Sequence, residues 1–410
     1  MHCSVLAPVA VIALFFAGCG EKQLNDPGVD ASTGGTADAD LREDDAAVVR
    51  DGGLMAPPLP PFPGGCDSDD DCADICRLGI CVTPPLERHQ SSYGCHDMPL
   101  PATRPNLACI DDPPVLAEGP AQVAARGKVE FFGDGIQTVG LTIRVYEFST
   151  FDPRPCMEAA GAEQDVIVAR RLIEACVDTL GAPLAQTVTV PCNPPDAESG
   201  CYALDAVPTG RRLVIRVTGD LTEWVPTYQY GVFINPCSVP VLRATSGTCP
   251  EDFMLDDSVN WACDLTADPG GAYFHRNFSV ISQRTWTTFP PTAGLGRINI
   301  GNGAIAGRLF DCEGRYIINA TFALARPGSV TTYFNGNPDD LLPQPGQTQT
   351  NNLGTYAALD VPPGPNGLVA VGRRIQAVPT VASERFFLLP NTVTLVNPAG
   401  RRPLEEEPPF

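Results

Sequence analysis

The sequence predicts an all-β protein built mainly from two consecutive β-sandwiches, and three observations support this fold class. The chain of 410 residues contains 42 prolines and 39 glycines, which favour turns over long helices. Its apolar residues form many short runs bounded by turn-forming residues, as in antiparallel β-structure. A series of strand-like segments that starts at Gly127 is also repeated from Gly303.

The N-terminal segment predicts export and attachment to a membrane. An apolar run from Val5 to Phe16 has the length of a signal-peptide core, and the small pair Ala17-Gly18 leads into Cys19. This resembles the lipobox of bacterial lipoproteins, which implies that residues 1–18 are removed and that Cys19 is acylated. The alternative is an ordinary signal peptide that is cleaved nearby and leaves Cys19 as a thiol.

Residues 19–62 predict a disordered acidic tether between the anchor and the folded part. The stretch from Glu21 to Asp51 contains nine acidic and three basic residues, and large apolar side chains are few. Such a segment cannot bury enough surface to order itself. It ends in a stiffer proline-rich stretch at 57–61.

The overall net charge of −21 argues against nucleic acid and anionic lipid surfaces as partners. Membrane contact is therefore expected only through the lipid.

Cysteine usage fits an oxidising compartment. Of the 16 cysteines, setting aside Cys3 and Cys19 leaves an even number, and exported proteins keep cysteines mainly as disulfides. The disulfide candidates are Cys66, Cys72, Cys76, Cys81, Cys95, Cys109, Cys156, Cys176, Cys192, Cys201, Cys237, Cys249, Cys263 and Cys312.

Residues 63–118 predict a small cysteine-rich module held together by cross-links. Its first four cysteines have the spacing C-x5-C-x3-C-x4-C and allow three pairings, among which the sequence does not choose. A zinc site is the competing interpretation, but the paired C-x2-C of zinc ribbons is missing. We expect no metal here.

The acidic run within this module has some features of a calcium loop. Asp67, Asp69 and Asp71 alternate like the first ligands of an EF-hand, but Cys72 and Leu78 occupy the positions that require Gly and Glu. An EF-hand is therefore excluded. A solvated loop and a weak, irregular calcium site remain as alternatives.

The two repeats predict the sandwiches, at 119–235 and 298–400. GCYAL at 200–204 corresponds to GTYAA at 354–358, and each is followed by a V-P-x-G turn. Alternating apolar residues place every second side chain on one face of a strand, and the glycine permits the positive φ of a tight turn.

The residues that follow the first V-P-x-G turn predict a strand with one buried and one exposed face. Leu213, Ile215 and Val217 share one face, whereas Arg212 and Arg216 share the other. We expect the arginine face to point to solvent.

The stretch G-x-Y-x-L-x-x-V-P-x-G, from Gly200 to Gly210, resembles carboxypeptidase regulatory-like domains, which have a transthyretin-like (prealbumin-like) sandwich fold. The second repeat matches less closely, because Ala358 and Leu359 shift the alternation. The resemblance covers about half of the chain. It implies accessory modules without catalytic residues, of a kind found in surface, adhesion and polysaccharide-associated proteins.

A helical insertion is expected within the first sandwich, and Gly181 and Pro183 should end it. Packing on its own sandwich is favoured over binding a partner. Its apolar stripe consists of Val166, Ala169, Ile173, Cys176, Val177 and Leu180, opposite Asp165, Arg170, Arg171, Glu174 and Asp178.

The favoured disulfide pairs are Cys156–Cys176 and Cys192–Cys201, with Cys95–Cys109 third. Residues 236–297 are expected to link the repeats, and their three cysteines form with Cys312 a set of unknown pairing. Residues 401–410 predict a solvated, disordered tail.

Catalytic patterns are absent from the sequence: it contains no G-x-S-x-G, H-E-x-x-H or phosphate-binding loop. His96 beside Cys95 could form a thiol–imidazole pair, but the even cysteine count argues against a free thiol. The adjacent carboxylates Asp256-Asp257 and Asp339-Asp340 give no sign of converging in a cleft. We therefore expect neither an enzyme nor a cofactor.

Aromatic residues offer the better indication of binding, with Trp224 and Trp286 as candidate ligand contacts. The alternative is that they fill the core. The full set is Trp224, Tyr228, Tyr230, Phe233, Trp261, Tyr273, Phe274 and Trp286.

The sequence thus predicts a lipid-anchored exported protein of the outer membrane or cell surface of a Gram-negative bacterium. Its β-sandwich modules would serve adhesion, recognition or structural support, with a surface glycan or protein as partner. The alternatives are a carbohydrate-binding surface lipoprotein and a surface hydrolase whose site spans the linking segment.

Overall fold

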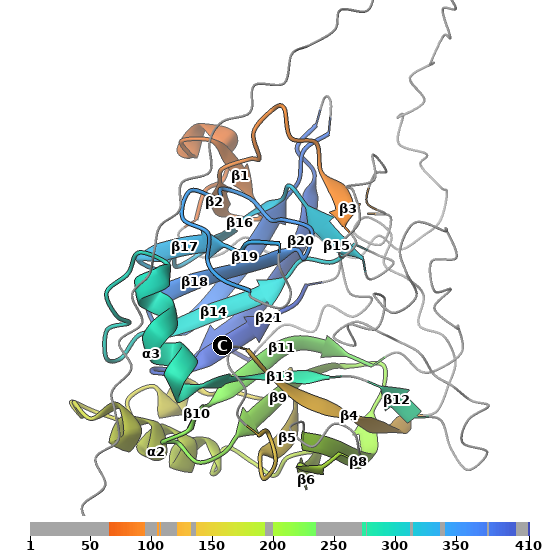
Figure 1. Ribbon diagram of the computed structural model, residues 1–410, viewed down its shortest axis with the longest axis vertical. Coiled ribbons are helices and arrows are strands. Elements are labelled where there is room, and N and C mark those ends of the chain that lie inside the picture. Colours follow the sequence, from red (N-terminus) through yellow and green to blue (C-terminus); the bar gives the residue numbers. More distant parts are fainter. Residues whose placement is uncertain are drawn as a thin grey trace, which may run out of the picture. The chain divides into compact units, whose positions relative to one another are not determined.

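The computed structural model confirms the all-β class. Within the residues it describes, strands form five sheets and helices are few (Figure 1). All of these residues belong to one compact unit, Met55–Phe410. The described residues are 65–94, 105, 107, 121–132, 137–192, 200–234, 273–275, 277–311, 315–336, 341–374, 377–398 and 409–410.

The cysteine-rich module is a small disulfide-bonded hairpin. Its strands β1 (Ile75–Arg77) and β2 (Ile80–Val82) pair antiparallel after a short 3-10 helix, η1 (Asp69–Asp71). The two turn residues, Leu78 and Gly79, both have positive φ, as a tight two-residue hairpin turn requires. Of the three pairings that the sequence allows, the structure contains Cys66–Cys76 and Cys72–Cys81.

The module also has an apolar contact of its own, with the second repeat. Ile80 and Val82 are buried against Val369 and Val371. Strand β3 (Ser92–Gly94) pairs antiparallel with β15 (Tyr316–Ile318). Cross-links are therefore not its only support, in contrast to the expectation from its composition.

One sheet belongs to the first repeat, and its strand order is β10-β13-β4-β8-β7, with β12 paired to β4. Strand β13 lies within the segment that was expected only to link the repeats, yet it pairs parallel with β4. The bounds are β4 Gln122–Phe132, β7 Val190–Pro191, β8 Gly200–Pro208, β10 Trp224–Val225, β12 Tyr273–His275 and β13 Phe278–Ser282.

The largest sheet has eight strands and runs through both repeats, in the order β17-β18-β14-β21-β11-β9-β5-β6. Its two halves join where β11 and β21 pair in parallel, from Thr227 opposite Val393 to Tyr230 opposite Val396. The bounds are β5 Thr142–Glu147, β6 Ala185–Val188, β9 Arg212–Thr218, β11 Thr227–Phe233, β14 Gly303–Arg308, β17 Val330–Tyr333, β18 Thr355–Val361 and β21 Val393–Val396.

A three-stranded sheet, β16 (Thr321–Leu324), β19 (Gly364–Val371) and β20 (Thr380–Leu388), completes the second repeat. Both V-P-x-G segments carry the chain from one sheet to another, from β8 to β9 and from β18 to β19. Gly210 and Gly364 have the positive φ that the turns were expected to need, 70° and 120°.

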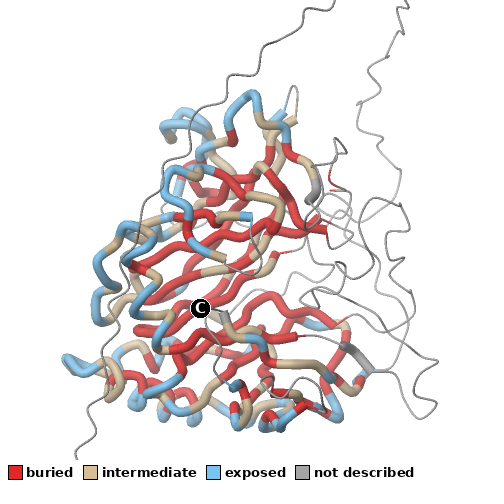
Figure 2. Tube along the Cα trace, viewed as in Figure 1, coloured by how far each residue is buried: buried red, intermediate tan, exposed pale blue. Residues whose placement is uncertain are grey.

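Two main apolar cores lie between these layers, and buried residues follow the strands in Figure 2. The first lies between the β4 sheet and one face of β5 and β9, and it includes Val129, Ile143 and Leu204. The second combines the interior of the second repeat with the opposite face of β9 and β11, and it includes Val214 and Tyr356. The repeats are thus united by packing as well as by strand pairing.

The predicted helix is present as α2 (Val166–Val177). Asp165 caps it by accepting hydrogen bonds from the backbone N–H groups of Ile167 and Val168. Ala169, Ile173 and Val177 are buried as expected. A second short 3-10 helix, η2 (Arg154–Cys156), precedes it, and the Cys156–Cys176 disulfide joins the two.

Two expectations about polar faces are wrong. Arg170 and Glu174, assigned to the solvent side of the helix, are buried, and so are Arg212 and Arg216 of β9. The reason is electrostatic pairing. Arg216 forms hydrogen bonds to Glu174 at 2.5 and 2.8 Å, and Arg212 forms an ion pair with Glu384 of β20. Carboxylates of α2 and β20 thus neutralise the arginines of β9, which allows that face of the strand to be buried.

The end of the tail also departs from the expectation of disorder. Pro409 and Phe410 are described, and the Phe410 ring packs edge-on against Phe148 and Phe387. The carbonyl of Pro409 accepts a hydrogen bond from Arg154. None of the helices among the described residues is long and apolar enough to cross a membrane.

A candidate binding pocket beneath helix α3

Helix α3 (Gln283–Thr292) begins directly after β13. The Ser282 hydroxyl caps it by accepting a hydrogen bond from the backbone N–H of Thr285. Pro290 and Pro291 lie in its last turn, where the helix ends. The helix lies beside the β14–β18 part of the eight-stranded sheet in Figure 1, and its Trp286 and Phe289 pack on that sheet.

The sheet surface under α3 carries small side chains. Side chains of β14 point alternately to the two faces of the sheet. Ile305 points into the core of the second repeat, whereas Ala304 and Ala306 lie on the opposite face, which α3 covers. Neighbouring β18 adds Ala357, another short side chain. Because alanines cannot fill the space below the helix, a pocket remains.

This pocket has a volume of about 110 Å³ and is partly open. Trp286, Phe289 and Phe334 give it aromatic walls, and the Phe289 and Phe334 rings are 5.4 Å apart between centroids. Its aliphatic lining comes from α3, the following loop and the strands below: Ile281, Pro290, Ile298, Ala304, Ile305, Ala306, Gly307, Ala357, Leu359, Val393 and Leu395.

Hydrogen-bonding groups also line the pocket. Thr355 is paired with Arg308 across β18 and β14, and the Asn397 side chain accepts a hydrogen bond from the Arg308 backbone N–H. Glu130 and Ser279, which are paired across β4 and β13, also line the pocket. Thr285 of α3 is a further polar lining residue, so the pocket combines apolar walls with a minority of polar groups.

Arg170 of α2 fixes the position of Trp286. Its guanidinium carbon lies 5.0 Å from the centre of the indole ring, a cation–π geometry. The same side chain donates hydrogen bonds to the Asn391 carbonyl and to Gln283 of α3. Its Nη2 atom is buried without a hydrogen-bond partner. Burial lowers the pKa of Arg170 to about 10, so the side chain is still a cation at neutral pH.

A second buried network lies behind α2 and serves structure. Glu174 accepts hydrogen bonds from Arg216 and, at 2.6 Å, from the Tyr228 hydroxyl. Burial raises the pKa of Tyr228 well above its ordinary value, so the phenol remains a neutral donor. Arg216 also pairs with Asp178. The polar groups of this network are bonded to one another, and we assign them a structural role.

The two candidate tryptophans have different environments. Trp224 is 2% exposed and belongs to the core of the first sandwich, so it cannot offer a ring face to a ligand. Trp286 is half-buried and lines the pocket. Tyr228, Tyr230 and Phe233 are buried. Trp261 and the side chains of Tyr273 and Phe274 lie outside the described residues.

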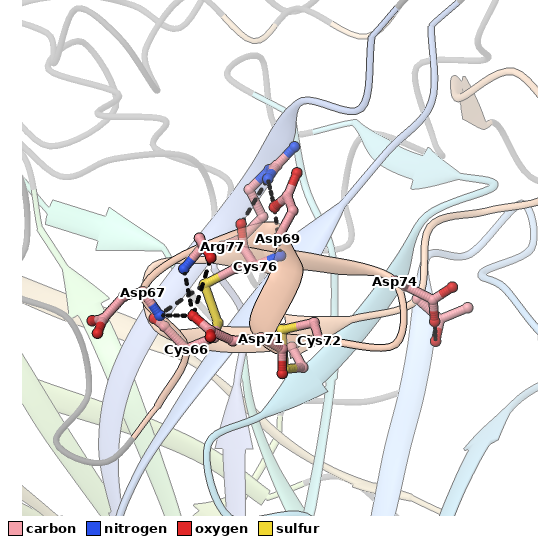
Figure 3. The surroundings of a disulfide bond; sticks show 11 residues. Cys66, Asp67, Asp69, Asp71, Cys72, Asp74, Cys76 and Arg77 are labelled. Atoms are coloured by element: carbon pink, nitrogen blue, oxygen red, sulfur yellow. Dashed lines mark hydrogen bonds and ion pairs between the residues drawn. A yellow bond between two sulfur atoms is a disulfide. The ribbon is translucent and has the colours of Figure 1, made fainter.

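The alternating aspartates of the cysteine-rich module do not converge on one point (Figure 3). Asp71 accepts hydrogen bonds from the backbone N–H groups of Asp67 and Ser68, and these bonds hold the pKa of its carboxyl below the ordinary value. Asp69 accepts from Cys76 N–H and from Arg77. The carboxylates act as acceptors within the loop, which does not favour a calcium site.

The cysteine candidates that the structure describes are all in disulfides. Cys156–Cys176 and Cys192–Cys201 are the two pairs favoured from spacing. Cys66, Cys72 and Cys81 lie close together, but their sulfurs are bonded in disulfides and offer no thiolate to zinc. The acylation candidate and the remaining cysteines lie outside the described residues: Cys19, Cys95, Cys109, Cys237, Cys249, Cys263 and Cys312.

Sequence reasoning identified Trp286 but missed the rest of the pocket. For the alanines of β14 and β18, the one signal that the sequence offers is small side chains at alternate strand positions. Arg170 was assigned to solvent because helical periodicity shows which residues share a face and not what covers that face.

No family model matches the chain, and no curated protein matches it. Among solved structures, the chain is similar to the shaft pilin SpaA of Lactobacillus rhamnosus GG, with 9% identity and a TM-score of 0.16 over 69% of this chain and 99% of that chain. It is also similar to the TIE protein of Bacillus anthracis, with 8% identity and a TM-score of 0.16 over 67% and 33%.

The major pilin T-13 of Streptococcus pyogenes gives 8% identity and a TM-score of 0.15 over 69% and 95%. Scores this low assign neither a family nor a function.

Proposed function

We propose that this chain is an exported, lipid-anchored envelope protein whose β-sandwich modules recognise a ligand without transforming it. Cys19 is the acylated residue, and the acidic segment to residue 62 holds the folded part away from the membrane. On this proposal the protein works at the outer membrane or cell surface of a Gram-negative bacterium.

One observation carries the recognition function: the pocket beneath α3 is built for contact. Among the described residues that line it there is a single carboxylate, Glu130, and no histidine, cysteine, lysine or aspartate. Such a set contains no carboxylate pair, imidazole, thiol or amine with which to carry out general acid–base or thiol chemistry. Apolar walls with a few polar groups are typical of sites that bind small ligands.

The disulfides support an exported location. The described residues contain four, distributed over the cysteine-rich module and the first repeat. Disulfides persist in oxidising compartments and are rare in the cytosol.

Acylation is tested by growing cells with a radiolabelled fatty acid and recovering the protein. The unchanged chain should carry label and fractionate with membranes, whereas Cys19→Ser should carry none. Cys3→Ser is the matched control, because Cys3 lies in the segment that is removed. Equal labelling of the Cys19→Ser protein and the unchanged protein would refute the anchor.

Carbohydrate binding is the second candidate, because the half-buried Trp286 ring lines the pocket and could stack on a sugar. Glycan-array binding that Trp286→Ala abolishes would favour it. Leu172→Ala, which removes an exposed apolar side chain of α2, is the control and should leave binding unchanged.

The hydrolase alternative placed its site across the linking segment, 236–297, of which the structure describes residues 273–275 and 277–297. The adjacent carboxylates Asp256-Asp257 and Asp339-Asp340 lie outside the described residues. No described feature favours it.

A further inference from the structure

We propose that the pocket beneath α3 binds one neutral monocyclic aromatic ring carrying a hydrogen-bonding substituent, such as a phenol. This rests on the proposed recognition function and names the chemistry of its ligand. The same chemistry is available from a free small molecule and from the side chain of a tyrosine.

The size of the pocket supports a single ring. Its volume is about 110 Å³, and it is partly open. An engineered apolar cavity of about 150 Å³ accepts benzene. A pocket of comparable size accommodates one ring with its substituent directed to the open side, and it is too small to enclose a fused ring system.

The walls favour an aromatic ring over an aliphatic group or a sugar. Trp286, Phe289 and Phe334 present rings around the space, and aromatic pairs gain from edge-to-face and offset contacts beyond their buried area. A sugar would place several hydroxyl groups against the side chains of Ala304, Ala306 and Ala357, which cannot form hydrogen bonds with them.

The polar lining residues determine which substituent the ring can carry and what charge it can have. Among the described lining residues, Arg308 is the one cation and Glu130 the one anion, and each has a partner of its own, Tyr316 for Arg308 and Asn277 for Glu130. Neutral polar groups come from Ser279, Thr285, Thr355 and Asn397. A net charge on the ligand would attract one of the charged residues and repel the other. A neutral group that both donates and accepts a hydrogen bond, such as a hydroxyl, matches this mixture.

Trp286 is held in place before any ligand arrives. Arg170 is fully buried, lies against the indole ring and bonds to Gln283 on the same helix as Trp286. A wall fixed in this way loses little freedom on binding, which favours affinity. Arg170 therefore acts as a positioning residue for the pocket.

The test uses the full chain carrying Cys19→Ser, which needs no detergent that would compete for an apolar site. Para-fluorophenol is the probe, and its binding is followed by fluorine NMR. The proposal predicts saturable binding that para-cresol displaces and methyl glucoside does not. Displacement by N-acetyl-tyrosinamide would support the proposal equally and would identify a tyrosine side chain as a source of the ring.

Filling the pocket provides the second arm. Ala306→Leu should weaken binding by about tenfold or more, since a single methylene can matter this much in an apolar pocket. Ala162→Leu, at an exposed position outside the pocket, is the matched control and should bind like the parent. Thermal unfolding of both variants shows that they are folded. If Ala306→Leu does not fold, Trp286→Phe serves the same purpose by reshaping the aromatic wall.

Three outcomes would overturn the proposal: no binding of the probe, displacement by methyl glucoside but not by para-cresol, or unchanged affinity in a folded pocket variant. None of them affects acylation at Cys19, so failure of this inference is distinguishable from failure of the proposed anchor.

Discussion

At the scale of single residues, this protein depends on polar groups that are buried with their partners. Arg216 with Glu174 and Arg212 with Glu384 connect elements that are distant in sequence. Such pairs contribute little over apolar packing when intact, but removing one partner leaves a buried charge and costs several kcal/mol. The sequence could not show this, because the charge that neutralises an arginine lies tens to hundreds of residues away.

Glu174→Ala tests the first of these pairs. The change should lower the free energy of unfolding by about 3 kcal/mol, because Arg216 would lose its main buried partner. Urea unfolding followed by tryptophan fluorescence measures the effect. Glu158→Ala, at an exposed position, is the control and should change stability little. Equal stability of the two variants would contradict the assigned role of Glu174.

Asp360 is a second buried acceptor, placed by a β-bulge. Gly303 pairs with Val361 and Ala304 with Leu359, so Asp360 is left over, with a φ of 58°. The carboxylate accepts hydrogen bonds from Asn299, Asn302 and Ser329.

The pH dependence of stability tests Asp360. Burial alone would raise the pKa of the carboxyl, but the hydrogen bonds hold it below its ordinary value of 3.8. A lowered pKa contributes stability that is present above pH 3.8 and is lost as the pH falls through the folded-state pKa.

Asp360→Asn keeps a residue that tolerates positive φ, yet it should cost about 2 kcal/mol at neutral pH, and the difference from the parent should shrink in acid. Urea unfolding at several pH values measures both. Asp205→Asn, at an exposed position of β8, is the control. A pH-independent difference would argue against the assignment.

At the scale of elements, local pattern predicted individual helices and strands well. The period of the apolar stripe located α2, and alternation located β8, β9, β18 and β19 together with their positive-φ glycines. Pattern did not predict the partners of these elements. Nothing local to the β13 sequence indicates that it pairs with β4, because that pairing is decided by contacts across nearly 150 residues.

The Cys156–Cys176 disulfide is the main covalent support of α2. It closes a loop with a sequence separation of 20 residues, and Cys156 is fully buried. Replacing both cysteines by alanine should lower the free energy of unfolding by about 3 kcal/mol, through the freedom that the unfolded chain regains. Chemical denaturation under oxidising conditions measures this.

Replacing Cys72 and Cys81 by alanine is the matched control, because that pair lies in the cysteine-rich module, away from α2. It should leave unchanged the near-ultraviolet circular dichroism of the aromatic residues around α2. An equal spectral change in both double variants would show that the Cys156–Cys176 bond has no special role at the helix.

At the scale of the whole molecule, the two repeats are one structure. Sequence reasoning separated them by a linker, because each repeat has its own alternating strands and V-P-x-G turn. The structure instead joins them through β11 and β21, through the core that both share and through Arg170, which connects α2 to the carbonyl of Asn391. The pocket beneath α3 depends on this union, since its lining comes from both repeats.

Hydrogen exchange at the junction of β11 and β21 tests this union most directly. If the repeats share one sheet, the backbone amides that pair Thr227–Tyr230 with Val393–Val396 should exchange as slowly as those of β9. They should exchange far more slowly than the amides of the edge strand β6. Rapid, edge-like exchange in both β11 and β21 would mean that the repeats are separate sandwiches, and would contradict a continuous eight-stranded sheet.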